Sequence, residues 1–322
     1  MESVQKPHRF LIVLCCVALG CGACSPGSTS GSPSAAGSSG VSTTPQQEPR
    51  IKAVASVYPI AWLIDQIGGE KVEASVLTPQ GAEPWGYTYS EADLGALNGA
   101  DVLFYVAGFQ PSLDAAVGQL SAPSVNLEES AKLVHHRGLA SNHGDESSEA
   151  GRQLDPYFWQ DPVRFSLVAE EISQSLTNMD PENSSLYAQN LAQLKTALEG
   201  LDTEFSQGLS QCASHAVVSY RAAYAYLTDR YHLNQVAVRG IDPSIDPTQK
   251  DLRMVKLGIA EGRPKAIFDE AGKSNPVMTD LAGQTGTQLA SLDTVTSEPA
   301  MADYLAAMRA NLESLRGGLG CV

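Results

Sequence analysis

Three of the six histidines fall within one short segment of the chain, between residues 135 and 153. With the acidic residues beside them they form the set His135, His136, His143, Asp145 and Glu146. Imidazole and carboxylate groups are ligands that zinc and related divalent cations accept. The segment is rich in Gly, Ser and Asn and shows no hydrophobic period, which is typical of a surface loop. Two interpretations follow: a weak, unselective metal site, or a solvated loop that holds nothing.

The chain carries no recognisable catalytic arrangement. No paired carboxylates, no serine and histidine pair and no phosphate-cradling glycine loop stand at the end of a predicted strand. Ser28 and Ser30 lie close to glycines, but no strand precedes them as a nucleophile elbow requires. His215 and His232 each stand alone and are expected to be ordinary packed or surface residues. The sequence therefore does not predict an enzyme.

The first twenty residues have the pattern of a secretory signal peptide. Lys6 and Arg9 give a charged start, and an unbroken apolar run follows from Phe10 to Leu19. That run of about ten residues is well short of the roughly twenty that a membrane-spanning helix needs. We expect residues 1–20 to be removed and the remainder to be exported.

Two cysteines directly after the apolar run resemble the lipidated cysteine of a bacterial lipobox. Cys21 is the expected lipidation site because the apolar run ends against it, and Cys24 is the alternative. The residues that follow are mostly Ser, Gly, Thr, Pro and Ala, a composition typical of a flexible tether. Residues 21–50 are therefore predicted to be a lipid anchor and tether that hold an extracytoplasmic protein on the cell membrane.

Cys212 and Cys321 are the two cysteines left in the folded body. Because an exported protein lies outside the reducing cytosol, this pair suggests one structural disulfide. The formal net charge of −15 argues against nucleic acid as a partner. The same charge fits both an attraction of cations and plain solubility, so it does not decide between them.

Short β-rich runs alternate with helical patterns throughout the body. The predicted strands are residues 51–57, 72–77, 102–106 and 124–127 in the first half, and residues 216–220, 235–239, 266–269 and 288–292 in the second. This alternation indicates an α/β fold with two similar lobes, each a mostly parallel sheet flanked by helices.

One long helix is predicted between the two halves. Apolar residues recur three and four positions apart from Tyr187 to Leu209, which places them on a single helical stripe. At about 1.5 Å per residue the helix spans roughly 40 Å and joins the lobes as a rigid connector. The expected domains are an N-terminal lobe over residues 51–180, the connecting helix over 181–210 and a C-terminal lobe over 211–322.

Several stretches together resemble the zinc and manganese solute-binding proteins of ABC transporters, and the likeness covers nearly all of the chain after the tether. Residues 53–60 with the glycines at 68 and 69 look like the opening strand and helix of that family. Residues 81–84, Gly-Ala-Glu-Pro, are similar to the loop before its first metal ligand, and residues 155–162 to the loop of its second. The resemblance implies a metal site between the lobes.

Most of the ligands that the resemblance implies are replaced in this sequence. Trp85 and Tyr157 stand where the family has its first two histidines, and Arg221 stands where it has His or Glu. Only Asp293 matches the fourth ligand, and one carboxylate cannot hold zinc tightly. We therefore expect these four side chains to converge between the lobes, with Arg221 standing in for the ion and forming a bidentate pair with Asp293.

Three functions fit this pattern. The first is the extracytoplasmic solute-binding lipoprotein of a metal-type ABC importer with weakened or altered binding of zinc or another divalent cation. It would be a monomer whose partners are the permease and ATPase subunits. The second is a receptor for a small organic solute, with Arg221 on a carboxylate, Asp293 on an amine and Trp85 and Tyr157 as flat walls. The third is an accessory protein whose lobes are locked by an internal Arg221–Asp293 pair.

Overall fold

The computed structural model describes residues 50–136, 154–242 and 244–322. The predicted signal peptide, the lipidation at Cys21 or Cys24, the tether up to residue 49 and the histidine at position 143 lie outside these residues. Within the described part of the chain, no helix combines the length and the apolar character that crossing a membrane requires.

The first lobe contains a four-stranded parallel sheet. Its strands are β1 (Ile51–Ala55), β2 (Val72–Val76), β3 (Val102–Tyr105) and β4 (Ser124–Asn126), in the spatial order β2-β1-β3-β4. The helices of this half are α1 (Tyr58–Gly68), α2 (Glu91–Ala96), α3 (Pro111–Val117) and α4 (Pro162–Met179). Short 3-10 turns occur at η1 (Gly69–Lys71), η2 (Pro84–Gly86), η3 (Leu97–Gly99), η6 (Phe158–Gln160) and η7 (Pro181–Asn183).

The second lobe repeats the topology of the first. Its strands are β5 (Ala216–Arg221), β6 (Asn234–Arg239), β7 (Ala266–Glu270) and β8 (Gln288–Leu292), all parallel, in the order β6-β5-β7-β8. Its helices are α6 (Ala225–Arg230), α7 (Gln249–Gly262), α8 (Pro276–Thr285) and α9 (Tyr304–Leu319). In each sheet the first strand of the lobe, β1 or β5, lies between the second and the third, and the fourth strand lies at the edge beside the third. The prediction of two similar parallel lobes is confirmed.

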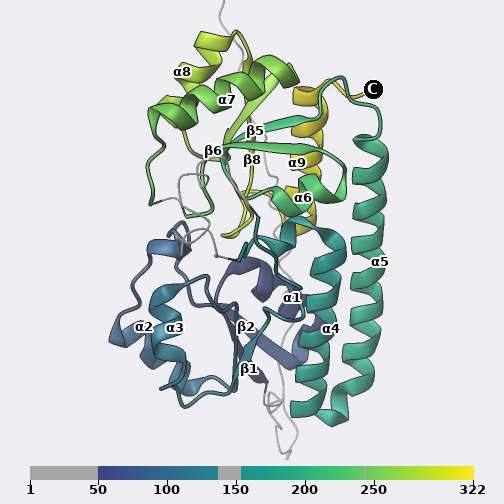
Figure 1. Ribbon diagram of the computed structural model, residues 1–322. Coiled ribbons are helices and arrows are strands. Elements are labelled where there is room, and N and C mark those ends of the chain that lie inside the picture. Colours follow the sequence, from purple (N-terminus) through teal and green to yellow (C-terminus); the bar gives the residue numbers. More distant parts are fainter. Residues whose placement is uncertain (1–49, 137–153, 243) are drawn as a thin grey trace, which may run out of the picture. The chain divides into compact units, whose positions relative to one another are not determined.

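A single helix, α5 (Ser184–Gly208), runs beside both sheets (Figure 1). Its 25 residues correspond to roughly 37 Å at about 1.5 Å per residue. It packs against α1 and α4 of the first half and against α9 of the second. The predicted apolar stripe faces this packing, since Tyr187, Leu194, Leu198, Leu201 and Phe205 are buried. The long helix therefore acts as a stiff connector.

Aromatic side chains fix the two halves where they meet. The indole of Trp62 in α1 stacks on Phe165 in α4 with ring centroids 5.9 Å apart, and it contacts the tilted ring of Tyr304 in α9 at 4.9 Å. The hydroxyl of Tyr304 donates to the carbonyl of Trp159 at 2.5 Å. At the far end of the second lobe, Cys212 and Cys321 form the disulfide expected from the sequence. The aromatic contacts thus join α1 and α4 of the first half to α9 of the second.

Candidate functional site

Arg221 ends strand β5 and reaches across to the first lobe. Its side chain is 5% exposed, and its two terminal nitrogens donate to the carboxylate of Glu83. Nη1 lies 2.9 Å from Oε1 and Nη2 lies 2.6 Å from Oε2, which is the fork geometry of a bidentate pair. Glu83 is placed by the loop that leads into η2. The charge of a fixed guanidinium therefore stands between the lobes.

Two further groups hold the guanidinium from the other side. Glu270, the last residue of β7, brings Oε1 within 2.7 Å of Arg221 Nε as a close ion pair, although the N–H does not point straight at the oxygen. Nη1 also donates to the Tyr157 hydroxyl at 3.1 Å, and Trp85 Nε1 donates to the same hydroxyl at 3.2 Å. The predicted neighbours Trp85, Tyr157 and Arg221 are thus brought together.

The electrostatics of this cluster favour a permanent positive charge on Arg221. Burial by itself would lower the pKa of the guanidinium, but Tyr157, Glu83 and Glu270 outweigh it and raise the pKa. Burial raises the pKa of Tyr157 to about 12, so its hydroxyl stays protonated. Lys273 adds a second positive charge, with Nζ 3.0 Å from Glu270 Oε2. Two cations therefore neutralise the two glutamates.

Asp293 follows β8 and lies near the cluster but outside it. Its Oδ1 accepts the N–H of Val295 at 2.7 Å. In the described part of the chain no ion pair joins Asp293 to Arg221, and the bidentate partner of Arg221 is Glu83. The expected Arg221–Asp293 pair is therefore wrong. The reason is geometric: Glu270 ends the strand next to β5, whereas Asp293 comes after β8, one strand further away.

The backbone of Asp293 is held from two sides. Asn311 of α9 accepts from the Asp293 N–H at 2.7 Å and donates to its carbonyl at 2.8 Å. From the first lobe, Trp159 Nε1 and Gln160 Nε2 donate to the carbonyl of Thr294 at 2.8 and 2.9 Å. Burial raises the pKa of the Asp293 carboxyl, and the nearby charge of Glu270 adds to this effect. The carboxylate is a pre-positioned acceptor.

A cavity of about 240 Å³ lies beside these groups. It is lined by Gly81, Ala82, Glu83, Pro84, Arg221, Glu270, Ala271, Gly272, Lys273, Asp293, Thr294, Thr296, Ser297, Glu298, Pro299 and Ala300. Trp85 and Tyr157 do not line it, since they are only 7% and 0% exposed and pack against other aromatic rings. Within residues 50–136, 154–242 and 244–322, no group of three or more acidic, histidine or cysteine side chains is arranged to hold a metal ion.

The histidines of the predicted loop do not meet one another in the described residues. His135 is exposed. His136 lies between two carboxylates, with Nδ1 2.7 Å from Asp155 and Nε2 3.0 Å from Asp229. Asp229 belongs to α6 of the second lobe, so this imidazole links the halves. It also contacts the ring of Tyr226 edge-on at 4.4 Å.

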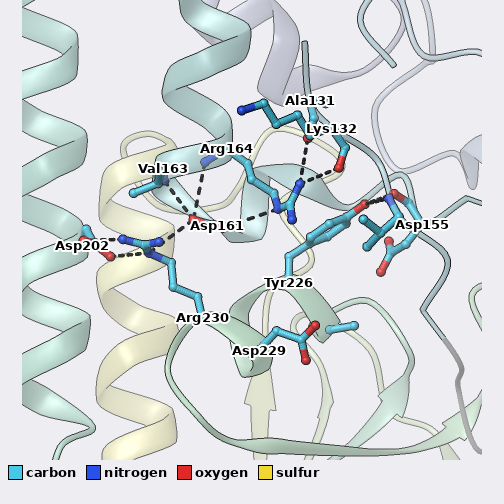
Figure 2. Close-up of polar contacts among 12 residues, drawn as sticks. Ala131, Lys132, Asp155, Asp161, Val163, Arg164, Asp202, Tyr226, Asp229 and Arg230 are labelled. Atoms are coloured by element: carbon cyan, nitrogen blue, oxygen red, sulfur yellow. Dashed lines mark hydrogen bonds and ion pairs between the residues drawn. The ribbon is translucent and has the colours of Figure 1, made fainter. Parts of the chain in front are cut away.

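A second charged network surrounds Asp161, the residue that caps α4 (Figure 2). Its carboxylate lies 3.6 Å from Arg164 Nε and 3.4 Å from Arg230 Nε. Arg230, from α6, also forms a bidentate pair with Asp202 of α5 at 2.5 and 2.7 Å. The guanidinium of Arg164 stacks over Tyr226 at 4.7 Å. These contacts are structural, and they tie α4, α5 and α6 together behind the cleft.

Sequence reasoning missed Glu83 and Glu270 as members of the site. Glu83 lies inside the Gly-Ala-Glu-Pro motif of residues 81–84, but the motif does not indicate that Glu83 is the counter-ion of Arg221. Glu270 directly follows a predicted strand, and carboxylates at the carboxyl ends of parallel strands are the signal that could have found it. Both residues matter because they remove the positive charge that Arg221 would otherwise present.

Comparisons with known proteins agree with the fold. The family model described as zinc-uptake complex component A, periplasmic, matches residues 53–318. A zinc-binding protein AdcA of Streptococcus pyogenes is 28% identical over 288 residues, covering 84% of this chain and 56% of its own length. The chain thus spans about half the length of these relatives. The high-affinity zinc uptake system protein ZnuA of Bacillus subtilis is 24% identical, with 96% of each chain covered.

Solved structures show the same architecture. The laminin binding protein Lmb of Streptococcus agalactiae, described as an adhesin with metal transporting activity, superposes with a TM-score of 0.74 at 24% identity and covers 84% of this chain and 99% of its own. The periplasmic zinc binding protein TroA of Treponema pallidum gives 0.73 at 18% identity, with coverage of 84% and 99%. Because the family model spans most of the chain, this protein belongs to the family of the periplasmic component A of zinc-uptake complexes.

Proposed function

We propose that this protein is the extracytoplasmic solute-binding component of an importer, and that Arg221 makes its cleft a weak site for zinc. Family membership supports the receptor role, because relatives are named for zinc binding and zinc uptake. The two parallel lobes and the cavity lined by residues of both support capture of a solute. The role is transport rather than catalysis.

The observation that carries the proposal is the guanidinium of Arg221 held between Glu83 and Glu270. The permanently protonated guanidinium occupies Glu83 and Glu270, two carboxylates that a metal would need. Asp293 is then the remaining carboxylate at the positions matching the family's ligands, and one carboxylate does not make a zinc site. In this proposal the Arg221 guanidinium supplies the positive charge that a bound metal ion would otherwise bring.

The partners follow from the same role. A receptor of this kind delivers its solute to a membrane permease driven by an ATPase subunit, and those are the partners we infer. A lipid on Cys21, or on Cys24, would keep the receptor next to the permease, with the Ser- and Gly-rich residues up to position 49 as its tether. A monomer is sufficient, since one chain supplies both walls of the cleft.

The test is to restore the three replaced positions together in the variant Trp85→His, Tyr157→His, Arg221→His. Zinc affinity is measured by competition with a chromophoric chelator. We expect a gain of about a hundredfold or more over the unmodified protein, because three imidazoles and the Asp293 carboxylate complete a tetrahedral set. The control is Arg253→His, which exchanges an exposed arginine of α7 for histidine and should leave the affinity unchanged.

Two outcomes would count against the proposal. Nanomolar zinc binding by the unmodified protein that is lost in Asp293→Asn would show that Arg221 does not weaken the site. No gain in the triple variant, with its circular dichroism spectrum preserved, would show that these positions do not converge on a metal position.

A further inference from the structure

We infer that the solute held in the cleft is a small organic cation whose ammonium group binds the carboxylate of Asp293. The inference rests on the proposed receptor role and names the chemical class of its ligand. It keeps the amine on Asp293 from the sequence-based alternative, but Arg221 holds no carboxylate of the solute and Trp85 and Tyr157 form no walls. The contacts around Arg221 and the lining of the cavity lead to this revision.

The first step concerns which charges in the cavity are already matched. Arg221 is paired with Glu83 and Glu270, and Lys273 is paired with Glu270. Asp293 and Glu298 also line the cavity, and no ion pair within the described ranges involves either of them. The unpaired charges in the cavity, those of Asp293 and Glu298, are therefore negative, and a cationic group of a solute would offset them.

The second step concerns Arg221 as an anion receptor. Nη1 donates to both Glu83 and Tyr157, Nη2 donates to Glu83, and Nε faces Glu270. To bind Arg221, the carboxylate of a solute would have to displace the bidentate pair with Glu83 or the close ion pair with Glu270, and both contacts are already charge-assisted. Arg221 therefore serves as a fixed counter-ion inside the site, and the cavity does not favour an anion.

The third step concerns Asp293 itself. Oδ1 receives the Val295 N–H, whereas Oδ2 receives no hydrogen bond from the described residues. Asn311 fixes the backbone of Asp293, and the Val295 N–H orients its carboxylate. A partly buried carboxylate without a cationic partner costs free energy, and a bound cation recovers it.

The fourth step separates an ammonium from a metal ion. A divalent metal needs several carboxylates, and it could recruit Glu83 or Glu270 only by displacing Arg221. An ammonium donates three separate hydrogen bonds and needs only one charged partner. Thr294, Thr296 and Ser297 also line the cavity, and hydroxyl groups of this type are neutral acceptors. The donor set therefore suits an amine.

The fifth step is size. The volume of about 240 Å³ corresponds to roughly eight water molecules at about 30 Å³ each. That space suits a molecule with only a few heavy atoms, such as a short amino alcohol or diamine. Trp85 and Tyr157 lie beneath the lining, so stacking on aromatic rings does not contribute to recognition.

The experiment uses the purified full chain and isothermal titration calorimetry. The probes are ethanolamine and putrescine, their uncharged analogues ethylene glycol and 1,4-butanediol, the anion glycolate, and zinc and manganese chlorides. We expect one amine to bind per protein, with neither the uncharged analogues nor the anion producing heat. Asp293→Asn should weaken amine binding by at least about tenfold, since it removes the charge of a charge-assisted contact.

The control variant is Glu313→Gln, which removes a carboxylate that is 69% exposed and paired with Arg316 on α9. It should bind the amine as the unmodified protein does. Heat from neither amine, or equal amine affinity in Asp293→Asn, overturns the inference. If a metal alone binds with one-to-one stoichiometry, the amine is excluded but the receptor role stands. If no probe binds and native mass spectrometry finds no bound molecule, both proposals fail.

Discussion

The guanidinium of Arg221 lies 2.9 and 2.6 Å from the two carboxylate oxygens of Glu83, and this pair joins the two lobes. The pair is formed by residues that are 138 positions apart in the chain. Its location gives the protein a positive charge of its own between the lobes, with the acidic residues of both sides arranged around it.

Removal of that charge should destabilise the fold. Arg221→Ala leaves Glu83 and the buried Glu270 facing each other without a cation, and breaking a buried pair in this way costs about 3 kcal/mol or more. Urea denaturation would measure the loss. Arg309→Ala is the control, because its pair with Glu204 is 48% and 42% exposed and should contribute less than about 1 kcal/mol. Equal losses for the two variants would contradict the role assigned to Arg221.

Asn311 should be required to hold Asp293 in place. Asn311→Asp keeps an acceptor for the Asp293 N–H but sets a carboxylate oxygen against the Asp293 carbonyl, 2.8 Å away in the native contact. We expect a loss of about 2 kcal/mol, since a buried donor is replaced by a charge, and weaker amine binding in the same variant.

Asn178→Asp is the matched control for that change. Asn178 is exposed, and its side chain only accepts a hydrogen bond from Gln174, which a carboxylate does equally well. Its denaturation midpoint and amine affinity should stay as in the unmodified protein. An unchanged midpoint for Asn311→Asp would show that α9 does not fix the Asp293 loop.

The architecture could be predicted from the sequence because it depends on local patterns. Runs such as residues 216–220 and 266–269 are apolar and β-rich, and each became a parallel strand within one or two residues of the expected bounds. The stripe from Tyr187 to Leu209 likewise predicted one helix beside both lobes, which is what α5 does.

The pairing inside the site could not be predicted in the same way. Four carboxylates line the same cavity as Arg221, and its pairing with Glu83 and Glu270 rather than Asp293 depends on strand order, which residue types do not specify. The expectation that Arg221 stands in for the ion was therefore incomplete. The glutamates cancel the charge of Arg221 and Lys273, and Asp293 is left unmatched.

Helix α9 should tolerate a methyl group at one glycine and not at its neighbour. A Cβ on Gly318 would lie 2.5 Å from the ring of Phe268, a fully buried residue of β7. Gly318→Ala should therefore cost about 1–3 kcal/mol through overpacking. Gly317 has open space around it, so Gly317→Ala should be neutral or stabilise by up to about 1 kcal/mol. Thermal unfolding of both variants tests this contact, and equal melting temperatures would refute it.

The stability contributed by His136 should depend on pH. Burial favours the neutral imidazole, but the hydrogen bonds and charges of Asp155 and Asp229 prevail and raise its pKa above the ordinary 6.5. The groups that face it are these two carboxylates and Tyr226, over which Arg164 stacks. A raised pKa in the folded state means that the contribution is complete below pH 6.5 and is lost as the pH rises through the folded-state value.

We therefore expect the difference in melting temperature between the unmodified protein and His136→Gln to be largest near pH 6 and to shrink at pH 8. His215→Gln is the comparison, because the His215 side chain is exposed and its replacement should shift the melting temperature little at either pH. A difference for His136→Gln that is constant from pH 6 to pH 8 would mean that folding does not raise the pKa of the imidazole, and a difference that grows over this range would mean that the imidazole is neutral in the folded protein. In that case the link between α6 and the first lobe would be an uncharged hydrogen bond rather than an ion pair.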